Sequence, residues 1–329
     1  MISVGFFNNK GGVGKTTLLC NVAASLGSNK HKVLVLDADP QCNASAYLLP
    51  ENALAELLLD NKHSSIDSFF DPVRRGQGYA DNIPTIFSSK RFRVDLIVGD
   101  PKLSLREDLL ATDWAAMRNG EPRGFQTTYA IKELLSRLAH YDFVFVDMGP
   151  SLGALNRSVL LGVNYFLMPL SVDIFSLMAV SNILTSLNNW KDALTQAISR
   201  HFSSEHCNFQ IAGNDVSWDL KFAGYVMQQY TAKSTGGVRQ AVGAFERIIG
   251  EQKQELISLA KFFDTTDAVN NLGEVPTLSS IVPLSQLAHA PIFDLGAKDG
   301  IVGSHYNRVA EAGWFYHQIA DHFVKRVAG

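Results

Sequence analysis

A glycine-rich run with two lysines, KGGVGKTT, occupies residues 10–17 and is the strongest chemical signal in the sequence. Glycines in such a run let backbone N–H groups turn inward around phosphate oxygens, and the positive end of a following helix adds to the same point. Lys15 would then reach the β- and γ-phosphates, Thr16 would offer its hydroxyl to Mg²⁺, and Thr17 would contact a terminal phosphate. The run predicts a nucleotide site made by Lys10, Gly11, Gly12, Val13, Gly14, Lys15, Thr16 and Thr17. A glycine turn with two incidental lysines is the plainer alternative.

Acidic residues follow two other apolar runs. KVLVLD leads into Asp37 and Asp39, so a carboxylate pair emerges at the end of a predicted strand, where open α/β sheets bind ligands. FVFVD ends at Asp147, and Mg²⁺ is held by carboxylate oxygens, often through water, beside the threonine and the phosphates. Asp147 is therefore a candidate ligand of a magnesium-bound water. The plainer alternatives are a turn with a helix cap at Asp37 and Asp39, and an ordinary buried strand that ends at Asp147.

These side chains need a scaffold that brings strand ends together. Short β-branched and aromatic runs alternate with helical patterns, which is typical of an α/β fold with a mostly parallel sheet. We predict seven or eight strands with helices on both faces, because runs such as FVFV are apolar on both sides. Strands are expected at residues 2–7, 32–37, 94–98, 142–147, 165–169, 222–228 and 278–282, and helices are expected to begin near Thr16, Thr127, Leu155, Phe175, Val238 and His305.

The bulk composition indicates a folded protein rather than a disordered one. Of its 329 residues, 46% are hydrophobic and 19% are charged. The formal net charge of -3 excludes a globally basic DNA binder, so any contact with nucleic acid must come from a local patch. The three cysteines are widely spaced, which indicates neither a disulfide framework nor a zinc site. Without a secretory leader or a long uncharged apolar run, the expected location is cytoplasmic.

The chain is expected to form one domain over residues 1–329. Residues 49–93 are less regular than the rest, with several glycines and prolines, and they are expected to be an insertion on the scaffold. A second polar stretch, residues 203–219, contains Gly213, Asn214 and Asp215, which favour turns. No composition shift demands a domain boundary between these stretches.

The glycine-rich run departs from the standard phosphate-loop pattern at two positions. Asn9 stands where a glycine is expected, and Lys10 adds a cation. This combination resembles the deviant Walker A motif of the ParA/MinD family of P-loop ATPases. DADPQCN is similar to the family's switch I, and FVFVDMGPSLG resembles its Walker B and switch II, with Met148 and Gly149 in place of the commoner Thr-Pro. The specific matches cover residues 1–188 and are closest to the ParA, Soj-like partition branch.

The resemblance implies a P-loop NTPase fold of the SIMIBI, ParA-like class that binds ATP and Mg²⁺ and forms a homodimer on ATP binding. It implies that Lys10 reaches the partner's phosphates, that Asp39 orients the attacking water, and that Asp37 braces the switch loop. The implied catalytic residues are Lys10, Lys15 and Asp39, and the implied magnesium residues are Thr16, Asp39 and Asp147.

Weaker matches lie further along the chain. The residues from Asp173 to Ser176 resemble a stretch that packs at the family's dimer interface. Gln228 and Pro283 would lie near the adenine, where relatives place similar residues. Either strand could equally be core with an incidental polar end.

The C-terminal helix separates branches of the family, because MinD-like relatives carry a membrane helix there and partition relatives bind DNA nearby. Its apolar stripe favours a core-facing helix. A membrane anchor would carry a dense basic polar face, but this helix has Glu311 and Asp321 with few basic residues, so no membrane contact is expected. Nonspecific DNA binding needs several phosphate contacts. The candidates are Lys298, Arg308, Lys325 and Arg326, or the cluster Lys90, Arg91 and Arg93, and a solvated surface is an equal alternative for each.

Taken with the resemblance, the sequence predicts an ATPase that dimerises with ATP and positions or segregates DNA or another cargo. Slow hydrolysis, stimulation by an adaptor or ParB-like partner, and a cytoplasmic or nucleoid-associated location are part of that expectation. One alternative is a nucleotide-dependent regulatory switch of another assembly, such as a defence or cellular-positioning system. The other is a module whose nucleotide locks a dimer without being hydrolysed.

Overall fold

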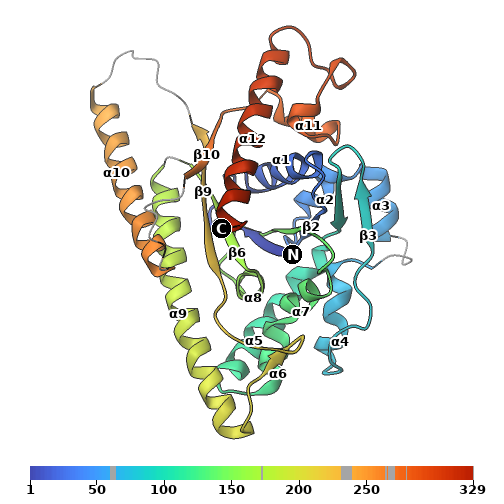
Figure 1. Ribbon diagram of the computed structural model, residues 1–329, viewed down its shortest axis with the longest axis vertical. Coiled ribbons are helices and arrows are strands. Elements are labelled where there is room, and N and C mark those ends of the chain that lie inside the picture. Colours follow the sequence, from blue (N-terminus) through green and yellow to red (C-terminus); the bar gives the residue numbers. More distant parts are fainter. Residues whose placement is uncertain are drawn as a thin grey trace.

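The computed structural model describes residues 1–59, 64–171, 173–230, 239–263, 265, 271–278 and 280–328. At its centre is an eight-stranded sheet in the order β10-β9-β6-β1-β5-β2-β4-β3, in which only the β3–β4 pair is antiparallel (Figure 1). Its strands are β1 (Ile2–Phe6), β2 (Val33–Asp37), β3 (Ile86–Ser89), β4 (Val94–Ile97), β5 (Phe143–Asp147), β6 (Tyr165–Leu170), β9 (Lys221–Tyr230) and β10 (Asn271–Pro276). The predicted mostly parallel sheet is confirmed.

Helices cover both faces of this sheet. One face packs against α1 (Lys15–Ser28), α2 (Asn43–Leu48) and α12 (His305–Ala328). The other face packs against α7 (Ala130–Ser136), α8 (Ala154–Gly162), α9 (Ile174–Glu205) and α10 (Arg239–Phe262). The remaining helical segments are α3 (Glu51–Leu59), η1 (Ile66–Phe69), α4 (Phe70–Arg74), η2 (Pro101–Arg106), α5 (Glu107–Arg118), α6 (Pro122–Thr128), α11 (Val282–Leu287), η3 (Ile292–Asp294) and η4 (Ala297–Asp299). No helix in the described part of the chain is long and apolar enough to cross a membrane.

The central strands are buried on both sides, which explains their uninterrupted apolar runs. In β2, Val33 and Val35 face the α1 layer, whereas Leu34 and Leu36 face the α7 and α8 layer, as period-two alternation requires. β5 lies between β1 and β2, and Asp147 pairs in register with Phe6 on one side and Asp37 on the other. The carboxyl ends of these three strands therefore meet at one edge of the sheet.

The structure corrects several expected elements. The predicted strand at residues 278–282 is wrong, because the chain turns at Ile281 and α11 begins at Val282, with Pro283 in its first turn, where the fixed φ of proline favours a helix start. The predicted helix start at Thr127 is also wrong, since α6 begins at Pro122 and ends at Thr128 before α7. The helix start predicted at Val238 lies outside the described residues. The helices predicted near Thr16, Leu155, Phe175 and His305 begin within one residue of those positions.

The two stretches expected as insertions hold structure of their own. The described part of residues 49–93 contains α3, η1, α4 and the antiparallel edge strand β3. Residues 203–219 contain the end of α9 and a small hairpin of β7 (Gln210–Ile211) and β8 (Asn214–Asp215). Ile211 of this hairpin packs in a separate small core with Met117 of α5 and Phe125 of α6.

A buried ion pair ties the first of these stretches to the segment before α5. Arg106 donates to both carboxylate oxygens of Asp67 at 2.7 Å, and the two side chains are 11% and 6% exposed. Arg106 also donates to Asp71 at 3.2 Å. Because removal of one member leaves an uncompensated buried charge, this pair should matter for stability.

Replacing Arg106 with alanine is expected to lower the free energy of unfolding by about 3 kcal/mol, since Asp67 then stays buried without its partner. Urea titration followed by circular dichroism measures this change. The matched control is Arg74→Ala, because Arg74 pairs with Asp71 at the surface, where both side chains are more than 40% exposed. That change should cost less than about 0.5 kcal/mol. Similar losses in the two variants would contradict the prediction.

Candidate functional site

The glycine-rich run forms the loop between β1 and α1. Gly12 and Gly14 have φ of 75° and 77°, a left-handed conformation that glycine adopts without strain, and Gly14 is the N-cap residue of α1. A side chain at Gly11 or Gly12 would meet nothing within 4 Å, so the loop backbone faces open space. Backbone N–H groups at the start of α1 are thereby available to an anion.

The Lys15 ammonium is folded back into this loop. Its Nζ donates to the carbonyl oxygens of Asn8 and Lys10, each at 3.1 Å, and the residue is buried. Burial lowers the pKa of Lys15 from its ordinary value, while the carboxylates of Asp147 and Asp39 oppose that shift. The ammonium thus lies at the loop's centre, with partners that a phosphate oxygen could replace.

Lys10 is held by a different part of the chain. Its Nζ lies 2.5 Å from Asp173 Oδ2 and 3.2 Å from Ser171 Oγ, just before α9. Asp173 is also the N-cap residue of α9 and accepts from the backbone N–H groups of Phe175 and Ser176. Partial burial raises the pKa of Asp173, but the hydrogen bonds from Lys10 and its other partners outweigh it and hold the pKa at about 2. In this structure, the Lys10 side chain therefore bonds to residues that precede and cap α9 in the same chain.

Three carboxylates, those of Asp37, Asp39 and Asp147, lie close together beside the loop. Asp147, at the end of β5, accepts a hydrogen bond from Thr16 Oγ1 at 2.8 Å. Asp37, at the end of β2, accepts from Ser45 N and Ser45 Oγ at 2.7 and 2.6 Å. Burial raises the pKa of Asp37 to about 6, although the Ser45 hydrogen bonds oppose the shift. Burial also raises the pKa of Asp147 well above its ordinary value, and the nearby charge of Asp37 adds to this. A nearby cation would relieve this crowding of negative charge.

The donor set fits a magnesium ion. Asp147 Oδ1 is buried and has no hydrogen-bond partner among the described residues, although its other oxygen is bonded to Thr16. An unpartnered buried carboxylate oxygen is costly unless a cation or water satisfies it. Mg²⁺ prefers oxygen ligands and keeps several waters. Thr16 and Asp147 are thus arranged to hold such an ion, and Asp39 faces the same space.

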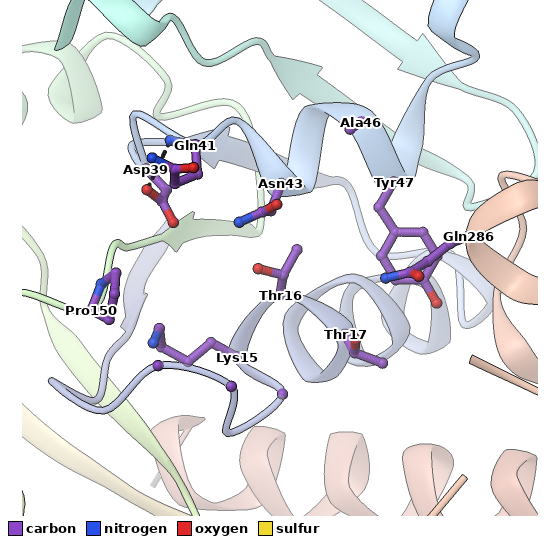
Figure 2. Close-up of a pocket in the computed structure, with 13 residues that line it drawn as sticks. Lys15, Thr16, Thr17, Asp39, Gln41, Asn43, Ala46, Tyr47, Pro150 and Gln286 are labelled. Carbon is purple, nitrogen blue, oxygen red and sulfur yellow. Dashed lines mark hydrogen bonds between the residues drawn. The ribbon is translucent and has the colours of Figure 1, made fainter. Parts of the chain in front are cut away.

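A cavity of about 380 Å³ lies beside the phosphate loop (Figure 2). Lys15, Thr16 and Thr17 line one side of it, and Asp39 and Pro150 line the opposite side. Two further lining residues, Gln41 and Asn43, belong to the DADPQCN motif. No sequence motif indicated the others, which come from α2 and α11: Ala46, Tyr47 and Gln286.

A second cavity of about 230 Å³ lies beside the first, and Gly14 and Thr17 line both. Gln228, at the end of β9, and Pro283, in α11, line it together with Tyr316 of α12. The structure thus brings both residues expected near adenine to one place next to the loop. Gln228 is buried, and its Nε2 has no hydrogen-bond partner within the described ranges. An amide in this position could bond to a purine edge.

Replacing Gln228 with alanine is expected to weaken ATP binding about fivefold, because one neutral hydrogen bond to the base would be lost. Inorganic tripolyphosphate should bind equally well to both proteins, because it has no base. Calorimetric titration of each ligand measures the two affinities. The control is Gln318→Ala on the exposed side of α12. Equal weakening for both ligands would place Gln228 at the phosphates instead.

The two arginines of the basic cluster near β4, Arg91 and Arg93, already bond to other residues of the chain. Arg91 donates to both oxygens of Asp299 at 2.8 and 2.9 Å, so its charge is neutralised within the fold. Arg93 donates to Ser28 Oγ at 2.9 Å. On α12, Arg308 donates to Ser280 Oγ at 3.0 Å. The structure therefore does not present Lys90, Arg91 and Arg93 as one free basic patch.

Comparison with known proteins agrees with this geometry. A family model described as an AAA domain matches residues 1–200. The chromosome partitioning protein ParA of Myxococcus xanthus is 29% identical over 192 residues, which are 57% of this chain and 58% of that protein. The chain therefore spans little more than half of that relative's length.

Solved structures share the architecture over more of the chain. Protein DIP2308 from Corynebacterium diphtheriae has a TM-score of 0.68 at 29% identity, over 88% of this chain and 97% of that one. The ATP complex of a McdA variant from Cyanothece has a TM-score of 0.60, over 100% of this chain and 96% of that one. At 14% identity, the second match shows the fold alone.

Proposed function

Because the chain belongs to the ParA/MinD family of P-loop ATPases, we propose that it dimerises on binding ATP and hydrolyses the nucleotide slowly, with stimulation by a partner protein. The purpose of this cycle is to position or segregate DNA or another cargo in the cytoplasm or on the nucleoid. A ParB-like adaptor is the proposed partner, by analogy with partition relatives.

One observation carries the proposal. The loop glycines, Lys15, Thr16 and Asp39 line a single cavity at the carboxyl ends of β1, β2 and β5, and the buried carboxylate of Asp147 is hydrogen bonded to the Thr16 hydroxyl beside it. Open α/β sheets bind ligands at such an edge. The convergence of cationic and acidic groups fits a triphosphate together with its cation, because each set neutralises the other when both ligands are present.

The residues around the cavity have separate roles in the proposed hydrolysis. Lys15 exchanges its two carbonyl partners for phosphate oxygens and neutralises charge there. Thr16 and Asp147 would hold Mg²⁺, which supplies further neutralisation of the phosphates when bound. Asp39 Oδ1 accepts from the backbone N–H of Gln41 at 3.0 Å, which fixes the carboxylate facing the cavity. From there Asp39 can orient a water molecule toward the terminal phosphate.

The surface around Lys10 fits a dimer interface. Ile174, Phe175 and Met178, in the first turns of α9, are between 45% and 67% exposed although they are large and apolar. They follow Asp173, the partner of Lys10, directly in sequence. A second copy that covered this face would bury apolar area, and release of Lys10 from Asp173 would free it to reach the nucleotide of the other subunit.

Replacing Asp39 with alanine tests the proposed reaction. The variant is expected to bind Mg·ATP and to dimerise, but to release phosphate at least about tenfold more slowly, because the water loses its positioning group. Nucleotide titration, light scattering and single-turnover phosphate release measure the three properties. Asp108→Ala, an exposed change in α5, serves as the control.

Two outcomes would reject parts of the proposal. If the unaltered protein releases no phosphate at saturating ATP and Mg²⁺, and the Asp39 variant behaves identically, the nucleotide only locks a dimer. If ATP and Mg²⁺ leave the protein monomeric at all accessible concentrations, the dimerising cycle itself is rejected.

A further inference from the structure

The N-terminus of α8 is capped by a residue from another helix. The backbone N–H groups of Ala154 and Leu155, the first two residues of α8, donate to Glu107 Oε1 and Oε2 at 2.5 and 3.0 Å. Glu107 is the first residue of α5, and α5 and α8 lie against each other in the lower half of Figure 1. A carboxylate at this end of a helix satisfies free amides and complements the helix dipole.

The residue before α8 leaves room for this cap. A Cβ at Gly153 would lie 1.9 Å from Glu107 Oε1, so any side chain there would displace the carboxylate. The two helices are also joined one turn further on, where the Arg157 guanidinium of α8 stacks 4.1 Å from the ring centroid of Trp114 in α5. α8 is therefore held against α5 by two contacts.

The other end of this connection reaches the nucleotide cavity. Asn156 of α8 is buried, and its Nδ2 donates to the carbonyl oxygens of Gly149 and Ser151 at 2.8 and 2.6 Å. Gly149 packs on the catalytic candidate Asp39, because a Cβ at Gly149 would lie 3.2 Å from Asp39 Oδ1. Pro150, between these two loop residues, lines the cavity. The loop of residues 149–153 is thus fixed to α8 on one side and touches the reacting groups on the other.

We propose that Glu107 is a positioning residue for ATP hydrolysis, which acts through α8 and Asn156 on the loop of residues 149–153. This inference rests on the proposed function, since it concerns the rate of that reaction. Glu107 lies outside the phosphate loop and both cavities, and it touches neither the loop lysines nor the carboxylates of the site. A role limited to helix capping would alter stability and leave turnover by the folded protein unchanged.

The test compares Glu107→Ala and Glu107→Gln with the neighbouring control Asp108→Ala. Glu107→Ala should lower kcat about tenfold and change KM and ATP affinity less than about twofold, because the phosphate contacts are untouched. Glu107→Gln keeps one carbonyl acceptor and should recover part of the rate, and Asp108→Ala should match the unaltered protein. The proposal would be overturned if folded Glu107→Ala kept the kcat of the unaltered protein. It would also be overturned if the ATP affinity of this variant fell as much as its kcat.

A double-mutant cycle tests the route. If Glu107 acts through Asn156, the double variant Glu107→Ala, Asn156→Ala should be no slower than the slower single variant. Independent, multiplying losses would overturn the assigned route. Thermal unfolding of each variant, measured beforehand, shows that only folded proteins are compared.

A second readout does not depend on hydrolysis. Hydrogen exchange at Gly149 and residues 151–153, which Glu107 does not itself bond, should be faster with Mg·ATP bound in Glu107→Ala than in the unaltered protein and unaffected in Asp108→Ala. If the unaltered protein fails to hydrolyse ATP, the proposed function falls, and this exchange still decides whether Glu107 positions the loop. Identical exchange in all three proteins would overturn the positioning role.

Discussion

Replacing Lys15 with alanine is expected to weaken ATP binding about 100-fold, because a charge-assisted contact to phosphate is worth about 1.5–3 kcal/mol and the alanine leaves the phosphate charge unmatched. The ammonium lies inside the loop, and its hydrogen-bond partners among the described residues are two carbonyl oxygens, which carry no positive charge that could take its place. Calorimetry or a fluorescent ATP analogue measures the affinity.

Two controls separate lost binding from lost structure. Burial disfavours the charged form of Lys15, so the alanine variant should unfold at the same temperature as the unaltered protein or higher. Lys102→Ala removes an exposed lysine from η2 and should leave ATP affinity unchanged. Retention of full affinity by the Lys15 variant would remove this loop as the phosphate site.

The centre of the candidate site is predictable because it depends on local rules. KGGVGKTT lies between an apolar run and a helical pattern, which specifies a strand, a loop and a helix. Asp37 and Asp147 each end a run that is apolar on both faces, as in a buried parallel strand. Neighbouring parallel strands place their carboxyl ends at the same edge of the sheet. β2 and β5 pair in parallel with Asp37 opposite Asp147, so the two carboxylates lie at that edge as expected.

The wall of the cavity depends on packing between distant segments, which no local pattern encodes. Tyr47 of α2 and Ser285 of α11 have their hydroxyl oxygens 2.6 Å apart, although 238 residues separate them. This contact brings Gln286 to the cavity. The five residues 278–282, Leu-Ser-Ser-Ile-Val, are too few to show a period that distinguishes a strand from a helix, so their structure depends on contacts with distant segments.

The cap on α8 could not be predicted from the sequence either, because it also joins distant segments. Glu107 and Ala154 are 47 positions apart, and each lies at the start of a helix whose own pattern says nothing of the other. Gly153 permits a close approach to the start of α8, but a glycine in a loop does not show which residue approaches it. Only the three-dimensional contact identifies Glu107.

Replacing Lys10 with alanine is expected to leave ATP affinity within about threefold and to lower the rate of phosphate release about 100-fold or more, as when a cation supplied by a partner is removed. The reason lies in its contacts. Lys10 Nζ bonds to Asp173 and Ser171 of its own subunit, so it contributes little to the loop around a nucleotide in the monomer. Its effect should therefore appear only in the dimer.

Asp173→Asn provides the matched variant, because the amide oxygen can still cap α9 while the attraction for Lys10 is reduced. Since the Lys10–Asp173 ion pair must open before Lys10 can cross the interface, this variant should dimerise with ATP at lower protein concentration than the unaltered chain. Light scattering across a concentration series, with phosphate release from the same samples, measures both effects. If Lys10→Ala instead weakened ATP binding as much as Lys15→Ala does, the two lysines would serve one phosphate site within a single subunit, and the ion pair with Asp173 would have no part in dimerisation.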